Sequence, residues 1–177
     1  MRSNLLIPLP PMAKFGVNQS MKPATLPQAK NTFRTPKKQV IYIPNLMRPY
    51  PQQFLNAVAK NWPKSSFKNY WKGNTYYNSL LSDLKRMRPK PMLQPDSILW
   101  VSAMCHAKTS GAIGRTGHDR VTPECIKKRR FLAACRDYGS SKPLTIIMAL
   151  LMDEEVESLG HRKILMSHSY TQAGVSI

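Results

Sequence analysis

The fold prediction starts from residues 138–177, which read YGSSKPLTIIMALLMDEEVESLGHRKILMSHSYTQAGVSI. The run from Leu144 to about Glu155 has the length and composition of a long apolar helix. A turn, Gly160-His161-Arg162, follows this run, and residues 173–177 have the composition of a short final strand. A helix and a strand joined by a short loop predict an α+β fold.

These forty residues resemble the bacterial CAP domains of the SCP/PR-1 superfamily. The resemblance implies an α-β-α sandwich with a shortened sheet over residues 74–177. Looser matches are Met92 to Asp96, His106-Ala107, Gly117-His118 and Tyr138-Gly139. The specific matches are Leu159-Gly160-His161-Arg162-Lys163, Ser169-Tyr170-Thr171 and Gly174-Val175.

In that family two histidines and two glutamates line a central cleft and can hold a divalent ion. The resemblance places His118 and His161 at the two histidine positions. The first glutamate position is occupied by Ala133-Ala134-Cys135, and the second has no clear match in residues 149–153. Since Zn²⁺ needs three or four protein ligands, we predict no metal and no cofactor. We favour the alternative to a metal site, in which His161 stabilises its turn and His118 is an ordinary loop residue.

Apolar spacing predicts four further helices. The clearest covers residues 74–87, with apolar side chains at 77, 80, 81 and 84. Another begins at Asp96 or Ser97, either of which can cap it, and continues to Gly111. Shorter helices are predicted over residues 52–60 and 123–132.

A short strand is predicted at Val40-Ile41-Tyr42-Ile43, a β-branched and aromatic run closed by Pro44. The last strand has no following partner strand in this sequence, so its edge carries unpaired N–H and C=O groups. We expect either this segment or a strand from a neighbouring protein to cover that edge.

Positive charge is concentrated in the first part of the chain. The formal net charge is +18, no Asp or Glu precedes Asp83, and residues 1–82 carry twelve Lys or Arg. Nine of the fifteen prolines lie within residues 1–51. Residues 1–73 are therefore predicted to form an extended basic arm with one short strand and one short helix. Such an arm takes a fixed shape only when neighbouring macromolecules hold it, since ordering each residue costs roughly 1–2 kcal/mol.

Partners of this arm are expected to be acidic. Unbalanced cations attract nucleic acid or acidic protein surfaces, and the alternative is a solvated tail that aids solubility. The predicted contact residues include two lysines near the start of the first predicted strand and the densest basic run of the chain, residues 127–130. An exposed helix face explains the run at 127–130 equally well. The predicted contact residues are Lys37, Lys38, Lys127, Lys128, Arg129 and Arg130.

The three cysteines, Cys105, Cys125 and Cys135, suit neither a zinc ribbon nor a Cys-x-x-Cys motif. We predict reduced, partly buried thiols in a protein assembled in the cytoplasm. The N-terminal residues MRSNLLIPLPPM are broken by prolines before a signal-peptide core can form. No apolar run is long enough for a membrane span, so no membrane contact is predicted.

Catalysis is not expected from the motifs. There is no Gly-x-Ser-x-Gly and no phosphate-binding loop, and the acidic residues 153–157 have the pattern of a solvated surface. The sequence therefore predicts a non-catalytic subunit of a bacteriophage particle, present in several copies, with its arm threaded between protein neighbours. The alternatives are a stand-alone CAP-type protein that binds a lipid, peptide or glycan, and a ribosomal-type nucleic-acid-binding protein.

Overall fold

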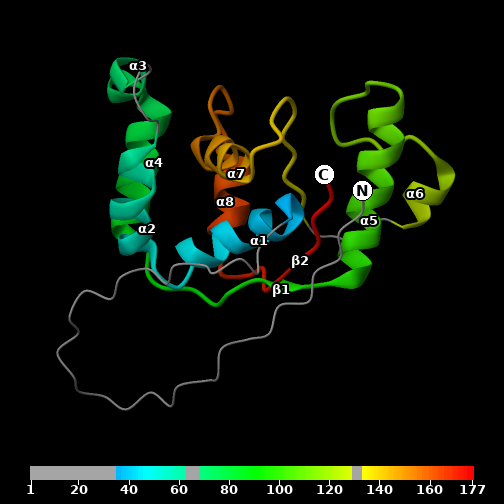
Figure 1. Ribbon diagram of the computed structural model, residues 1–177, viewed down its shortest axis with the longest axis horizontal. Helices are drawn as coiled ribbons and strands as arrows, with labels where there is room; N and C mark the ends of the chain where they lie inside the picture. Colours follow the sequence, from blue (N-terminus) through cyan, green and yellow to red (C-terminus); the bar gives the residue numbers. More distant parts are fainter. Residues whose placement is uncertain (1–34, 63–67, 129–132) are drawn as a thin grey trace, which may run out of the picture.

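The fold is mostly helical in the computed structural model, which describes residues 35–62, 68–128 and 133–177 (Figure 1). Within these residues the strands are two residues long each, and helices form the core, so the prediction of an α-β-α sandwich is wrong. The elements are α1 (Pro36–Met47), α2 (Pro51–Ala57), the 3-10 turn η1 (Ala59–Asn61), α3 (Lys68–Gly73), α4 (Thr75–Arg86), β1 (Gln94–Pro95), α5 (Ser97–Ala112), α6 (Pro123–Lys127), α7 (Pro143–Met152), α8 (Gly160–Leu165) and β2 (Gln172–Ala173).

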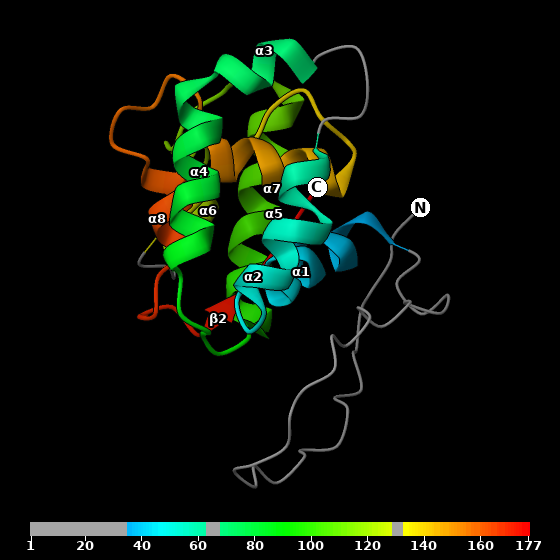
Figure 2. The same cartoon turned by 90° about the vertical axis from the view of Figure 1, so that its left-hand side faces the viewer.

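Helix α7 is the centre of the core. It is apolar on every face, as expected of a helix that is surrounded by other elements, and Ile147, Met148 and Leu151 are almost completely buried. It packs against α1, α4 and α8, while α2 packs against α1 and α4. Figures 1 and 2 show these helices grouped together.

Among the helices of the described residues, none has both the length and the apolar character needed to span a bilayer.

Residues 40–43, predicted as an edge strand, form the middle of α1 instead. The apolar side chains that α1 buries, Val40, Ile41, Pro44 and Met47, recur at helical spacing. Pro36 occupies the first turn, where its missing N–H costs nothing. Pro44 removes one internal hydrogen bond. Burial against α7 outweighs that loss and the β propensity of the run, since each large apolar side chain buried contributes about 1.5–3 kcal/mol.

The helices predicted over residues 74–87 and from Asp96 or Ser97 onward are confirmed. The Asn74 side chain accepts a hydrogen bond from Tyr77 N at 2.9 Å and begins α4. The Asp96 carboxylate accepts one from Leu99 N at 2.7 Å and begins α5. Both bonds satisfy a backbone donor that has no partner within its own helix. The predicted helix at 123–132 is observed only as α6, and residues 129–132 lie outside the described part of the chain.

The sheet consists of β1 and β2, which pair in parallel with Gln94 opposite Gln172. Gln94 N donates to Thr171 O at 2.8 Å, and Asp96 N donates to Ala173 O at 2.9 Å. The predicted final strand over residues 173–177 is thus shorter and begins one residue earlier. Gly174 follows it and lies against the backbone of Leu99 and Trp100, where a Cβ atom has no room. Glycine at this position lets the C-terminal segment reach the first turn of α5.

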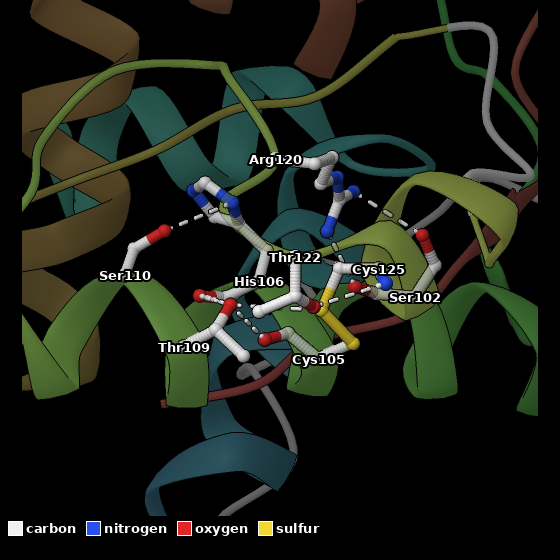
Figure 3. The surroundings of a disulfide bond; sticks show 8 residues. All are labelled: Ser102, Cys105, His106, Thr109, Ser110, Arg120, Thr122 and Cys125. Atoms are coloured by element: carbon white, nitrogen blue, oxygen red, sulfur yellow. Dashed lines mark hydrogen bonds between the residues drawn. A yellow bond between two sulfur atoms is a disulfide. The ribbon is translucent and has the colours of Figure 1, made fainter.

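Helices α5 and α6 stand to one side of the core and are joined by a disulfide between Cys105 and Cys125 (Figures 1 and 3). The prediction of three reduced thiols is therefore wrong for this pair, and Cys135 is the free cysteine. The two cysteines are twenty residues apart, so no local motif signals their pairing. The loop between α5 and α6 brings them together.

Arg162 joins α8 to α7 and α4. Its guanidinium is buried and donates to Leu151 O at 2.5 Å and Met152 O at 2.8 Å, which lie at the end of α7. It also donates to Tyr76 O, Ser79 Oγ and Asp83 Oδ2 on α4. The planar guanidinium satisfies all these acceptors with a single side chain. This explains why the segment after α7 turns back against the core.

Candidate functional site

The structure brings together the two histidines that the resemblance singled out. His118 lies in the exposed loop after α5, and His161 is the second residue of α8. Their ring centroids are 6.4 Å apart, and the ring planes differ by only 16°. Residues more than forty positions apart in sequence thus form one imidazole pair.

Asp153 holds His161 in place. The Asp153 carboxylate accepts from His161 Nδ1 at 2.7 Å and from His161 N at 2.8 Å, and the side chain is almost completely buried. Sequence reasoning had assigned Asp153 to a solvated surface, which is wrong. The signal that was missed is an Asp directly after a wholly apolar helix, since Asp tolerates the left-handed conformation that ends α7 here.

The loop between α7 and α8 contains three non-glycine residues with positive φ, namely Asp153 (54°), Glu155 (64°) and Leu159 (49°). This conformation costs roughly 1–2 kcal/mol for each such residue. The bonds from Asp153 and Arg162 compensate for this strain and fix the position of His161. Because Nδ1 is bonded to Asp153, Nε2 is the ring nitrogen left for another partner.

A cavity of about 220 Å³ lies beside His161. It is smaller than the usual pockets for drug-sized ligands, which begin near ~300 Å³. Helix α7 and the loop after it supply its apolar wall. Its charged and polar lining consists of Arg136, Asp137, Asp153, Glu154 and His161.

Burial shifts the pKa of Asp137, which lines this cavity, and of His118, whose ring lies beside that of His161. It raises the pKa of Asp137, whose Oδ2 atom is buried and makes no hydrogen bond within the described residues. It also lowers the pKa of His118, and the positive charge of Arg136 adds to this effect. Each group is thereby shifted toward its neutral form.

Cys135 is close to His161 and Asp153, but its thiol does not have the properties of a nucleophile. Burial, assisted by the negative charge of Asp153, raises the pKa of its thiol to about 12. A thiol with this pKa is almost entirely protonated at neutral pH, whereas the thiolate is the reactive form. Its Sγ donates weakly to His161 O at 3.8 Å.

The described residues also contain no group of three or more His, Cys, Asp or Glu that could hold a metal ion.

The basic residues predicted as partner contacts are scattered. Lys37 and Lys38 lie in the first turn of α1 and are partly buried, whereas Lys127 and Lys128 are exposed at the end of α6. Arg129 and Arg130 lie outside the described residues. Val40 to Ile43 belong to α1 and are not available for strand pairing, so the prediction that they cover the sheet edge is wrong. A covering strand from a neighbouring protein stays a prediction.

Comparison of the chain with protein families, with curated proteins and with solved structures finds no match. The resemblance to CAP domains stays a prediction, and the function must be argued from the charges and contacts of the chain itself.

Proposed function

We propose that this chain is a non-catalytic structural subunit of a large macromolecular assembly, with a bacteriophage tail, connector or head–tail ring as the setting. In this proposal the protein is present in several copies. Its positively charged surface binds acidic neighbouring subunits or nucleic acid.

The observation that carries the proposal is the distribution of carboxylates. All nine Asp and Glu residues of the chain lie within the described residues. Four of them, Asp83, Asp96, Asp153 and Glu154, bond to other groups of the fold, and Asp119 pairs with Arg115 on the surface. Among the described residues, exposed Lys and Arg side chains outnumber exposed carboxylates, and such a surface attracts polyanions and acidic proteins.

A non-catalytic role is supported by the chemistry around His161. A His–Asp pair performs nucleophilic catalysis only with a nucleophile within hydrogen-bond reach of the imidazole. The cysteine nearest to the pair is protonated, and its sulfur contacts the backbone oxygen of His161 rather than the ring. The pair instead fixes the loop that joins α7 to α8.

Native mass spectrometry of the complex purified from its natural source tests the proposal. We expect the chain in stoichiometric, repeated copies together with other proteins. Purification as a soluble monomer that does not associate with other macromolecules would contradict it.

A second candidate is a stand-alone protein that binds a small ligand, which the cavity beside His161 favours. In that case the isolated monomer should bind a ligand in the cavity, and Asp153→Asn should weaken binding. A structural subunit should instead retain its assembly contacts in that variant, provided that the variant is folded.

A further inference from the structure

The most concentrated positive charge in the described residues begins in the last turn of α4 and was not predicted as a contact site from the sequence. Residues 85–90 read KRMRPK and contain four cations in six positions. Lys85, Arg86 and Arg88 are exposed, and Lys90 is partly buried. We call these residues the 85–90 segment.

The 85–90 segment is held in one conformation. Helix α4 ends at Arg86, and Met87 continues with extended backbone angles. Pro89 and Pro91 disfavour a helical conformation of the residue before each of them. The Gln52 side chain from α2 donates to Leu84 O at 3.1 Å and Lys85 O at 2.8 Å. Because the backbone is already fixed, only the cationic side chains have to be ordered when the segment binds a partner.

Arg48 adds a buried charge beneath this segment. Its backbone oxygen accepts from Lys90 N at 2.7 Å, and its Nε donates to Pro91 O at 2.7 Å. The other guanidinium bonds go to the backbone oxygens of Leu165, Ser167 and Tyr170. Every one of these partners is a neutral carbonyl. Since an arginine keeps its proton inside proteins, the side chain contributes a full positive charge here.

The carboxylate of Asp83 is shared between Arg86 of the segment and Arg162 of α8. Asp83 Oδ1 lies 3.1 Å from Arg86, and Asp83 Oδ2 lies 3.1 Å from the buried Arg162. Lys85, Arg88 and Lys90 form no ion pair within the described residues. The two cations that pair with this carboxylate are Arg86 and Arg162, and no ion pair offsets the charges of Arg48, Lys85, Arg88 and Lys90 within the described residues.

We propose that the 85–90 segment is a binding surface for the phosphodiester backbone of a nucleic acid. The inference rests on the proposed function and names one partner of the subunit. The core of a protein–protein interface is enriched in aromatic residues and depleted of charge, whereas Met87 is the single large apolar residue of this segment. Surfaces that bind nucleic acid are strongly positive, and arginine and lysine both bind phosphate oxygens.

The test is fluorescence anisotropy of the full-length protein with a labelled DNA duplex, between about 50 and 200 mM NaCl. The test variant is Lys85→Gln/Arg88→Gln/Lys90→Gln. The matched control, Lys72→Gln/Lys108→Gln/Lys142→Gln, removes the same charge from exposed positions elsewhere. Thermal unfolding followed by circular dichroism establishes that both variants are folded.

For the wild-type protein we expect log K to fall steeply with log[NaCl]. Each lost phosphate contact reduces the slope by about 0.9, so the test variant should lose about 2 to 3 units of slope and the control less than one. Equal losses in the two variants, or no DNA binding by the wild type, would overturn the inference.

A parallel titration uses polyglutamate as an acidic polypeptide. If polyglutamate binds the 85–90 segment more tightly than DNA at equal salt, the inference is wrong and the partner is an acidic protein. The proposed assembly role would survive that result, because it is judged independently by native mass spectrometry. Conversely, DNA binding by a protein that purifies as a free monomer would overturn the assembly role alone.

Discussion

His161 and Asp153 are joined by two hydrogen bonds, one from the ring Nδ1 at 2.7 Å and one from the backbone N at 2.8 Å. Asp153 ends α7, and His161 lies in the first turn of α8, so the pair closes the loop between the two helices. Asp153 is 3% exposed, which keeps water from competing for its oxygens. The pair therefore sets the direction in which the chain leaves α7.

Asp153→Asn should destabilise the protein by roughly 1–3 kcal/mol, the usual effect of weakening a buried hydrogen bond to a charged group. Asparagine also tolerates positive φ, so this variant changes the side-chain carboxylate and leaves the backbone conformation as it is. Urea unfolding followed by circular dichroism measures the loss. Glu155→Gln in the same loop is the control, since Glu155 is exposed. Equal stability of the two variants would show that the pair contributes nothing.

Arg162→Lys should destabilise the protein by roughly 3–5 kcal/mol, as expected when a buried charged network is broken. Lysine has three donors and no planar fork, so it cannot satisfy the five acceptors that surround Arg162. Thermal and urea unfolding measure the effect. The control Arg86→Lys lies on the surface and should change stability by less than about 0.5 kcal/mol. A stable Arg162→Lys variant would contradict the role assigned to this side chain.

Loss of the Cys105–Cys125 disulfide should lower stability by about 3 kcal/mol, the effect expected for a loop of this length. Within the described residues α6 has few other contacts with the body of the protein. Reduction should therefore make Lys127 and Lys128 more accessible to trypsin. Digestion with and without a phosphine reductant measures this. The Cys105→Ala/Cys125→Ala variant should be cleaved at the faster rate under both conditions, and a reductant effect that persists in it would implicate another thiol.

Cys135 should make stability fall as the pH rises from 9 toward 12. The pKa of its thiol is about 12 in the folded protein, against an ordinary value of 9.0. Between these values the folded state keeps a proton that the unfolded state has lost, so a higher pH favours unfolding. The effect has an upper limit of about 1.4 kcal/mol per pH unit. Burial also raises the pKa of Tyr77, which acts in the same direction.

The comparison that isolates Cys135 is between the wild-type protein and Cys135→Ala. The difference in their unfolding free energies, measured by urea titration, should be constant below pH 9 and change above it. A difference that stays constant up to pH 12 would mean that the thiol is not buried as described.

The sequence alone was sufficient for the elements that depend on neighbouring residues. The apolar spacing over residues 74–87 was sufficient to predict α4. Asp96, one of the two predicted caps, begins α5, because a capping side chain bonds a backbone N–H only three positions away. The apolar run that forms α7 was also correctly assigned to a helix, although α7 ends at Met152 and not near Glu155. The excess of positive charge follows from composition, and no fold can remove it.

Tertiary structure decided the rest, because the deciding contacts join residues far apart in the chain. Burial against α7 makes residues 40–43 helical despite their β-branched composition. The Cys105–Cys125 disulfide, the approach of His118 to His161 and the burial of Asp153 depend on how the loops return to the core. The positive surface after α4 depends on Arg48, whose partners lie up to 122 residues away. The local sequence pattern predicts which segments are helical, whereas long-range packing determines which charged side chains are buried, paired or exposed for binding a partner.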